Sequence, residues 1–439
     1  MAAGELHGPD SEIRDISPTR ELLDRLGKPG VSGGYLLLTG SKGKGSTAVI
    51  AARVLEALGY RVGLLTSPSL VNFRERIRVD GRAIPAEEWI RRVEEIAPHV
   101  EEIDAGLPPG RYFSPMGMVL AVALGHFAAS GVQIGVIEAG RGGRFDDTRL
   151  VPNVVSALTP IMLEHTPELG DTLTDIAWHK AGIIKAGSIV VSAAQESEAL
   201  AIIEREAARQ GAEIRLSGRD FEAAFVEGGD LERPGLEMTL QTPARDYGQV
   251  WLSLLGRYQV ENTAVAVSVV EALLERLGET HGDETYRRAV QEGLGQVVWP
   301  GRCQVLRRSP LVFLDGAIND ESARLFGESV AGLVRPPVSA VVSVPSTKDY
   351  TGVYRQVARL ASSVVITRFD SPYLTFPDDE EALGVARGFF GTALARPDFA
   401  SAYGAARELA GDEGTVLIVG TQTLSKAALR HWEFDLEVL

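Results

Sequence analysis

Short runs of apolar residues alternate with longer amphipathic stretches along most of the chain, a pattern typical of buried parallel strands joined by helices. The first clear run ends at residues 36–38, and a helix is expected from residue 48. A second run at residues 61–66 completes a strand–helix–strand unit, whose loops at the carboxyl ends of the strands are available for ligands. The spacing predicts further strands at residues 132–137, 154–158 and 189–191. The pattern therefore indicates an α/β fold with a mainly parallel sheet.

The alternation pauses at residues 299–302, Trp-Pro-Gly-Arg, which is the best candidate for a linker between domains. Beyond this turn, strands are expected at residues 311–314, 339–344, 363–367 and 415–419, with helices between them. A chain of 439 residues also exceeds what one hydrophobic core usually supports. We therefore predict two domains, residues 1–299 and residues 300–439, the second being smaller and doubly wound.

Composition limits the classes of function. Apolar residues make up 45% and charged residues 23% of the chain, as in globular proteins. The net charge of −15 argues against nucleic acid as a partner, because clustered lysine and arginine bind polyanions. Cys303 is the only cysteine, which excludes an internal disulfide and a cysteine-based metal site. Residues 1–14 lack the apolar core of a signal peptide, and no apolar run could span a bilayer, so we expect a cytoplasmic protein without a membrane partner.

The strand at residues 36–38 leads into a glycine-rich turn and then a helix, which is the arrangement of an anion site. Glycine lets the backbone approach a polyphosphate, a lysine reaches its terminal phosphates, and a hydroxyl can reach a bound Mg²⁺. The expected nucleotide-binding residues are Gly40, Gly43, Lys44, Gly45, Ser46 and Thr47. The Walker pattern is not strictly met, because Leu38 occupies its first glycine position and Gly45 separates the lysine from the serine. An ordinary strand-to-helix turn is the alternative interpretation.

Three further polar residues stand out along this part of the chain. Glu138 closes the strand at 132–137, where a carboxylate is expected to hold Mg²⁺, although a capping or salt-bridged glutamate would give the same pattern. His165 follows the strand at 154–158, and its position leaves both a ligand role and a structural role open. Lys180 lies in an apolar stretch of a helix, so it either extends to the surface or takes part in chemistry. The residues alone favour the surface.

The segment from residue 71 to residue 84 is rich in charge. It contains four arginines and two acidic residues: Arg74, Arg76, Arg78, Arg82, Glu75 and Asp80. A solvated charged hairpin and a basic loop that faces the substrate are both compatible with this pattern.

Several motifs occur together in a fixed order. They are Gly40–Thr47, Thr66–Pro68, Gly142–Arg144, Leu163–Thr166, Lys180–Ile183, Trp299–Arg302 and Asp315–Ala317. In order and spacing the chain resembles the folylpolyglutamate synthase and dihydrofolate synthase family of the Mur ligase superfamily, from about residue 20 to residue 439. The resemblance implies a Mur-ligase-like fold, with an N-terminal P-loop ATPase domain and a C-terminal Rossmann-like ligase domain.

The resemblance also implies an activity, that of an ATP-dependent amide ligase. A carboxylate attacks the γ-phosphate of ATP to give an acyl phosphate and ADP, and an amine, typically that of glutamate, then displaces the phosphate. Phosphoryl transfer of this kind depends on positioning and on neutralisation of charge. The implied partners are a small-molecule acid and an amino acid, and the protein is expected to be a monomer.

By resemblance, Lys44, His165 and Lys180 are the catalytic residues. Two Mg²⁺ sites are implied, the first held by Ser67 and Glu138 and the second by His165. The lysine matching Lys180 is carbamylated in the family and helps to order the second Mg²⁺, which replaces the surface role favoured above. A monovalent cation is a further implied cofactor.

The remaining site residues implied by resemblance bind the nucleotide. Asn262 and Arg302 would contact its phosphates. Asp315, from the second domain, would meet the ribose, so the two domains must close over ATP. Closure also keeps water away from the acyl phosphate.

The chain departs from the family pattern at several positions. Ile318 stands in place of a histidine expected near the nucleotide and the amino acid, Ser69 follows Ser-Pro where the family has histidine, and Tyr258 replaces another histidine. Residues 112–115, Tyr-Phe-Ser-Pro, replace a Phe-Glu motif near the pterin-facing region. The phosphate and metal residues are thus retained, whereas positions tied to the acceptor and the amino acid have changed.

Three hypotheses follow. The first is a ligase that adds glutamate to a folate-type carboxylate. The second is a ligase with the same acyl-phosphate chemistry but a non-folate acid or a different amine, in a specialised biosynthetic pathway. The third is a nucleotide-binding protein that does not ligate, and a P-loop kinase is weaker still because it would leave the second domain and Lys180 without a purpose.

Overall fold

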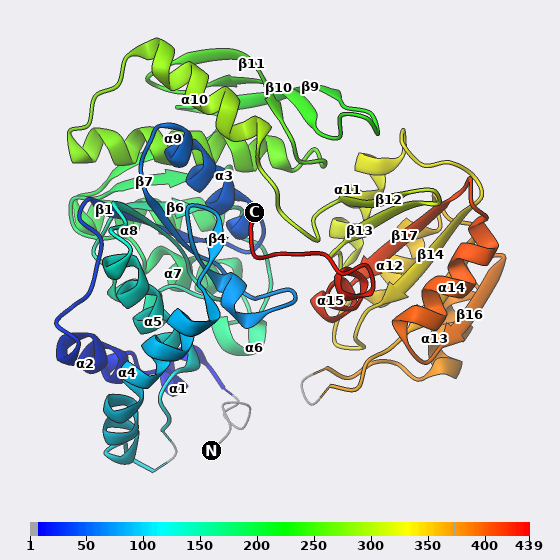
Figure 1. The fold of residues 1–439 in the computed structure, drawn as a ribbon, viewed down its shortest axis with the longest axis horizontal. Coiled ribbons are helices and arrows are strands. Elements are labelled where there is room, and N and C mark those ends of the chain that lie inside the picture. The colour runs from blue at the N-terminus through cyan, green and yellow to red at the C-terminus, as the bar shows by residue number, and fades with distance from the viewer. Residues whose placement is uncertain (1–7, 110, 372–373) are drawn as a thin grey trace.

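The computed structural model describes residues 8–109, 111–371 and 374–439. The expectation that the chain lacks a signal peptide rests partly on residues 1–7, which lie outside the described residues. Figure 1 shows two lobes side by side, with the strands and helices that precede residue 296 in one lobe and those that follow residue 303 in the other. Among the described residues, no helix has both the length and the apolar character needed to cross a membrane.

The main sheet of the first lobe has the strand order β4-β3-β2-β5-β1-β6-β7-β8. Its strands run parallel from β2 to β8, and β3 and β4 extend one edge as an antiparallel hairpin. The strands are β1 (Gly34–Thr39), β2 (Val62–Leu65), β3 (Ile77–Val79), β4 (Arg82–Ala83), β5 (Ile134–Glu138), β6 (Asn153–Leu158), β7 (Ile189–Ser192) and β8 (Glu213–Leu216). The predicted α/β fold with a mainly parallel sheet is confirmed.

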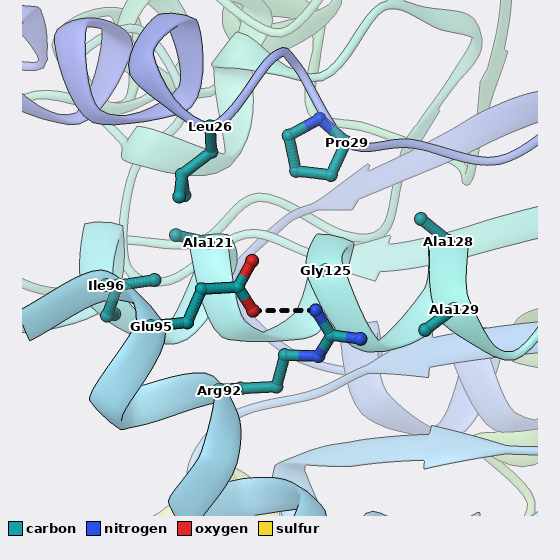
Figure 2. Close-up of a pocket in the computed structure, with 9 residues that line it drawn as sticks. All are labelled: Leu26, Pro29, Arg92, Glu95, Ile96, Ala121, Gly125, Ala128 and Ala129. Atoms are coloured by element: carbon teal, nitrogen blue, oxygen red, sulfur yellow. Dashed lines mark hydrogen bonds and ion pairs between the residues drawn. The ribbon is translucent and has the colours of Figure 1, made fainter.

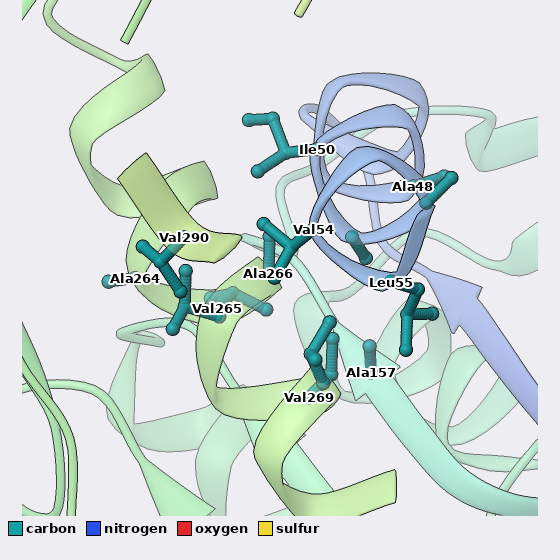
Figure 3. Packing of buried hydrophobic residues seen from close by; sticks show 14 of the residues in the cluster. Ala48, Ile50, Val54, Leu55, Ala157, Ala264, Val265, Ala266, Val269 and Val290 are labelled. Carbon is teal, nitrogen blue, oxygen red and sulfur yellow. The ribbon is translucent and has the colours of Figure 1, made fainter. Parts of the chain in front are cut away.

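Helices cover both faces of this sheet. They are α1 (Asp10–Ile13), α2 (Ser17–Arg25), α3 (Lys44–Ala57), α4 (Ala86–Ala105), α5 (Pro115–Ala129), α6 (Thr166–Leu169), α7 (Leu173–Ala181), α8 (Ser197–Gln210), α9 (Gln259–Leu277) and α10 (Asp283–Gly295), with 3-10 turns η1 (Phe73–Arg76) and η2 (Asp147–Leu150). Successive residues of β1 alternate between the faces: Leu36 and Leu38 pack with α3, α9 and α10, whereas Leu37 packs with α4 and α5. Figure 3 shows small and β-branched side chains of α3 and α9 packed over Ala157 of β6.

A separate antiparallel sheet packs on α9, and the sequence did not predict it as a distinct unit. It has the order β11-β10-β9, from β9 (Glu222–Gly228), β10 (Leu236–Gln241) and β11 (Asp246–Leu252). Alternate residues of β10, Leu236, Met238 and Leu240, are buried against the α3–α9 core. Residues 222–252 could not be recognised as one unit, because pattern alone does not show which strands pair.

The second lobe contains a sheet of order β12-β13-β17-β14-β15-β16, parallel except for β12. Its elements are β12 (Gln304–Arg308), β13 (Leu311–Asp315), α11 (Asp320–Val330), β14 (Val338–Ser343), α12 (Tyr350–Val357), β15 (Ser363–Thr367), α13 (Asp379–Ala386), β16 (Thr392–Arg396), α14 (Phe399–Ala410), β17 (Thr415–Gly420) and α15 (Gln422–His431). The edge strands β12 and β16 were not predicted. The domain boundary after residue 299 remains a prediction, supported by the absence of any described strand shared between this sheet and the other two.

Candidate functional site

The glycine turn lies between the end of β1 and the first residue of α3. Gly43 adopts a left-handed backbone conformation, with φ of +85°, and precedes Lys44 at the helix N-terminus. The Nζ of Lys44 donates to the carbonyl oxygens of Gly40 at 2.8 Å and Ser41 at 3.3 Å, so the lysine side chain lies along the turn. The predicted strand, glycine turn and helix are therefore present in one continuous unit.

Residues from distant parts of the chain close around this turn. A Cβ atom on Gly43 would overlap Oδ1 of Asn262, and one on Gly45 would lie 2.7 Å from the ring of Trp299. Asn262 is buried and donates to Gln259 at 2.8 Å, and Gln259 donates to the hydroxyl of Ser46 at 3.3 Å. The structure thus places the predicted residue Asn262 against the turn. It also places there Trp299 and Gln259, which we did not include among the candidate site residues.

The hydroxyl of Thr47 is an exception to the hydrogen bonding around the turn. Its Oγ1 is buried and has no hydrogen-bond partner. A buried polar atom usually has a partner, so this oxygen is available to a ligand or water. Thr47 lies in the first turn of α3, and the expectation that a hydroxyl at residue 46 or 47 reaches a bound Mg²⁺ stays a prediction.

Glu138 ends β5, the strand that pairs with β1 and β2. Its carboxylate is 3% exposed and accepts a hydrogen bond of 2.9 Å from the backbone N–H of Ser67. Burial raises the pKa of Glu138, and the positive charges of Lys44 and Arg302 oppose that rise. Ser67 and Glu138, predicted as one ligand pair, therefore lie next to each other, close to the glycine turn.

The donor set fits Mg²⁺ but would not hold it alone. Among the described residues there is no group of three histidine, cysteine, aspartate or glutamate side chains arranged as a metal site. Mg²⁺ commonly takes one or two protein oxygens and completes its shell with phosphate oxygens and water. A buried carboxylate with one hydrogen-bond donor and an adjacent serine hydroxyl suits that mode.

Lys180 lies within α7 and has no solvent exposure, so the surface role that its residue pattern favoured is wrong. Its Nζ donates to the carbonyl oxygens of Gly40 at 2.8 Å and Arg141 at 3.1 Å, and lies 3.7 Å from the carboxylate of Glu164. Burial and the neighbouring charge of Lys44 lower the pKa of Lys180 to about 7. The helix faces the glycine turn, which no local pattern could reveal.

Glu164 is a residue of this cluster that we did not propose as a site residue. Its two carboxylate oxygens lie 3.5 Å from Lys42 and 3.7 Å from Lys180. Burial opposes its ionisation, but Lys180 and Lys42 together hold the pKa of Glu164 below its usual value. An acidic residue beside His165 was the available signal, although its pairing with two lysines requires the tertiary structure.

His165 has a left-handed backbone, with φ of +54°, and is 39% exposed in its side chain. Burial lowers its pKa, which Glu164 and Glu168 oppose. Its Nδ1 lies 3.9 Å from Glu168. The charge of Glu164 thus acts on the pKa of both His165 and Lys180. The two residues predicted for the second Mg²⁺ site therefore lie in one cluster of charged groups.

Two predicted residues come from the linker and the second lobe. Asp315 ends β13 and is buried, and it accepts a hydrogen bond of 2.7 Å from the N–H of Cys303. Burial raises the pKa of Asp315 to about 6, and Arg302 opposes that rise. Arg302 also opposes the rise in the pKa of Glu138, so its positive charge acts on a buried carboxylate of each lobe.

The positions that depart from the expected pattern differ in their surroundings, and Tyr258 lies at the site, where its hydroxyl donates to Asp315 at 3.5 Å. Ile318 packs against the apolar core of the second lobe. Ser114 caps α5 and donates to Asp147 at 2.5 Å, and Thr19 donates to the other oxygen of the same carboxylate at 2.6 Å. The chain thus has a buried carboxylate, Asp147, facing the serine that stands where a glutamate was expected. We did not identify Asp147 from the sequence.

A cavity of about 140 Å³ lies away from these groups. Figure 2 shows it between the turn after α2 and helices α4 and α5, with Arg92 and Glu95 paired at its edge. None of the predicted site residues lines it. The glycine turn and the lysine–carboxylate cluster therefore remain the candidate site.

The glycine turn at a helix N-terminus, a buried lysine beside it and two α/β lobes define a two-domain P-loop nucleotide-binding protein. The chain is 32% identical over 364 residues to the dihydrofolate synthase/folylpolyglutamate synthase of Bacillus subtilis, covering 82% of each chain. It is 31% identical to that of Mycobacterium tuberculosis, covering 87% of this chain and 79% of the relative. The chain belongs to the folylpolyglutamate synthase and dihydrofolate synthase family.

Solved structures agree with this assignment. The folylpolyglutamate synthase of Mycobacterium tuberculosis complexed with ADP and AMPPCP matches with a TM-score of 0.87, at 28% identity and covering 97% of both chains. An FPGS–AMPPCP–folate complex matches with a TM-score of 0.80, at 27% identity and covering 95% of both chains. A scan with models of protein families gives no match.

Proposed function

We propose that this protein is an ATP-dependent ligase that joins glutamate to a folate-type carboxylate through an acyl-phosphate intermediate. The observation that carries the proposal is similarity along nearly the whole chain to folylpolyglutamate synthase complexed with ADP and AMPPCP, and to an FPGS–AMPPCP–folate complex. Relatives in the same family are named dihydrofolate synthase/folylpolyglutamate synthase. The predicted class of enzyme, an ATP-dependent ligase, is confirmed by this membership.

The residues of the glycine turn bind the triphosphate in this proposal. Backbone N–H groups at the start of α3 face the phosphates, and Lys44 turns from its carbonyl partners toward the terminal phosphate, where negative charge shifts during transfer. Asn262 fixes the turn from the opposite side, and Arg302 supplies a second positive charge from the linker. Asp315 would accept a hydrogen bond from the ribose.

Two Mg²⁺ ions would neutralise phosphate charge when bound. Ser67 and Glu138 would hold the first, since their hydroxyl and carboxylate are oxygen ligands at the same edge of the sheet. His165 would hold the second, together with Lys180 as its carbamate. A buried amine whose pKa is about 7 is partly neutral near that pH, and a neutral amine can add CO₂ with release of a proton. A monovalent cation remains a further cofactor that we predict without assigning residues.

A second candidate is a ligase of the same chemistry that uses another acid. The contacts of Ser114 favour it, because the buried carboxylate of Asp147 and its two hydroxyl partners give this region a polar pattern of its own. Ile318 packs against an apolar core and stands where the imidazole of a histidine was expected. We also propose that the protein acts as a monomer in the cytoplasm, without nucleic acid or membrane partners, in keeping with its net charge of −15.

The test is ligation by the purified full chain. The protein is incubated with ATP, Mg²⁺ and glutamate, and with either dihydropteroate or tetrahydrofolate, and the product is identified by its mass. We expect an amide product and equimolar ADP, and both should fall by orders of magnitude in Lys44→Ala. Amide formation with a different acid in an acceptor screen would favour the second candidate. Nucleotide binding with no product from any acceptor would contradict both.

A further inference from the structure

The last residues of the chain leave the second lobe and end on the first. After α15, residues 433–439 cross to the edge strand β4, as the red end of the ribbon shows in Figure 1. The N–H of Ala83 donates to the carbonyl oxygen of Glu437 at 2.8 Å, and the N–H of Leu439 donates to that of Gly81 at 3.0 Å. Val438 pairs with Arg82 as an antiparallel bridge, so the segment adds to the edge of the first sheet.

The apolar residues of this segment divide between the two lobes. Leu436 is buried in a core cluster of the second lobe, formed by its sheet and α14 and α15. Leu439 is buried in the α3–α9 core of the first lobe. Only two residues, Glu437 and Val438, therefore separate a side chain anchored in one lobe from a side chain anchored in the other.

Two arginines of the charged segment hold the crossing chain. Arg78 of β3 is 3% exposed and donates to the carbonyl oxygens of Leu436 at 2.6 Å and Glu437 at 3.3 Å. Arg74 makes two hydrogen bonds, of 2.5 Å and 3.1 Å, to the carboxylate of Glu437. Of the two alternatives left open for this segment, a solvated hairpin is wrong for Arg78, which is buried, and a role facing the substrate stays a prediction.

The same segment shapes the loop that carries Ser67. Arg78 lies opposite Leu64 on β2, and β2 leads directly into Thr66 and Ser67. The buried carboxylate of Glu75 accepts the backbone N–H groups of residues 70–72, at 3.2, 3.2 and 2.5 Å. Leu70 and Val71 pack on the second lobe, and Arg430 of α15 donates to the carbonyl oxygen of Val71 at 3.2 Å. The loop is therefore enclosed between β3, α15 and the terminal segment.

We propose that residues 433–439 are a strap that ties the second lobe to the first, and that Arg78 is a positioning residue which sets the loop of Ser67 through this strap. The strap keeps one side of the interface joined while the glycine turn and Asp315 approach each other around the nucleotide. The joining of the two lobes by the strap follows from the contacts above, whereas the effect of the strap on Ser67 rests on the proposed function.

Hydrogen–deuterium exchange of the full chain tests, without reference to activity, whether the strap joins the two lobes. A chain that stops at Asp435, and the variant Glu437→Gln, should both exchange faster at Ala83 and across residues 66–79, by about tenfold or more in the shorter chain. Glu433→Gln is the matched control, because it removes the same charge from an exposed position four residues earlier. Unchanged exchange at Ala83 in the shorter chain, or an equal effect of Glu433→Gln, would overturn the strap.

Kinetics test the positioning role. In Arg78→Lys, which keeps the charge but cannot reach both carbonyls as the guanidinium does, the Mg²⁺ concentration for half-maximal ligation should rise about threefold or more, with kcat at saturating Mg²⁺ within about twofold. A fall in kcat with an unchanged Mg²⁺ requirement would overturn this role. If the unaltered enzyme makes no amide with any acceptor, the proposed function fails, while the exchange result still decides the strap.

Discussion

The Nζ of Lys180 lies 2.8 Å from the carbonyl oxygen of Gly40 and is fully buried, although the helix around it was compatible with a lysine that extends to the surface. Such a lysine could not be distinguished from sequence because its neighbours in α7 do not show where the helix packs. Its partners Gly40, Arg141 and Glu164 come from three other segments. The resemblance predicted its place in the site, and the contacts supply the physical reason.

Replacement of Lys180 by alanine should lower ligation by orders of magnitude and leave the fold intact. If a carbamate is the active form, a small carboxylate such as acetate should restore part of the activity, because it can occupy the vacated volume with the same charge. Lys185→Ala is the matched control, since burial also lowers the pKa of Lys185 to about 8 but its Nζ binds Arg149 outside the site. A carbamate would be contradicted if acetate raised the ligation activity of both variants equally. It would also be contradicted if acetate did not raise the activity of Lys180→Ala.

A second prediction at the residue scale is that the carboxylate of Glu206 makes the stability of the fold depend on pH. Burial opposes its ionisation, but hydrogen bonds from Arg209 and Gln210 and the charge of Arg144 lower the pKa of Glu206 to about 2. Its carboxylate lies 2.5 Å from Arg209 and 3.3 Å from Arg144, and so joins α8 to the loop after β5. A carboxyl group whose pKa falls on folding stabilises the native state above its unfolded pKa, and this contribution is lost as the pH falls toward 2.

Glu206→Gln should therefore reduce the free energy of unfolding by about 1–2 kcal/mol at pH 7, allowing for the solvent that screens this pair. Thermal unfolding followed by circular dichroism should show a Tm lower by a few degrees at pH 7, and the difference should shrink between pH 5 and pH 2. Glu213→Gln is the control, because Glu213 is largely exposed and pairs with Arg215. A Tm difference that stays constant from pH 7 to pH 2 would contradict the assignment.

At the scale of elements, the strand, glycine turn and helix at residues 34–57 could be predicted because glycine spacing and apolar periodicity are local signals. The edge strands β12 and β16 could not, since their residues are mostly half-buried or exposed and lack a continuous apolar run. The antiparallel sheet of β9, β10 and β11 was missed as a unit for a related reason. Its burial against α9 depends on pairing between segments that the sequence pattern does not match to one another.

Alanine variants at two glycines should separate the effect of backbone strain from the effect of the close contact between Gly43 and Asn262. Gly43 and Gly59 both have left-handed backbones, with φ of +85° and +91°, but only Gly43 has a neighbour that a Cβ would overlap, Asn262. Each alanine variant should lose about 1–2 kcal/mol of stability from backbone strain. Gly43→Ala should in addition weaken binding of the non-hydrolysable analogue AMPPCP by about a hundredfold or more, measured by calorimetry, while Gly59→Ala should not change it. Similar affinities of the two variants would show that the close approach of Asn262 is not needed.

At the scale of the whole molecule, residues needed for one site lie on both lobes and on the linker between them. Glu138 ends a strand of the first sheet, Asp315 ends a strand of the second, and the charge of Arg302 lowers the pKa of both relative to what burial alone would give. Parallel sheets place ligand sites at the carboxyl ends of their strands, and Glu138 and Asp315 each close one such strand. The parallel core of each lobe could be predicted from the sequence, but the use of residues from both lobes in one site could be predicted only through the resemblance.

A nucleotide bound between the lobes should stabilise both at once, and Arg302 should govern that coupling. Arg302→Ala removes the positive charge near two buried carboxylates, so we expect the Kd of AMPPCP with Mg²⁺ to rise about tenfold to a hundredfold. The increase in Tm that the ligand causes at a fixed concentration should become smaller. The reason is that a ligand that binds the native state stabilises it by an amount that grows with the logarithm of the ligand concentration divided by Kd. Arg335→Ala is the control, since Arg335 lies exposed on the second lobe. If Arg302→Ala kept the original Kd while Lys44→Ala lost binding, the first lobe alone would hold the nucleotide, and closure would have to depend on the other substrates.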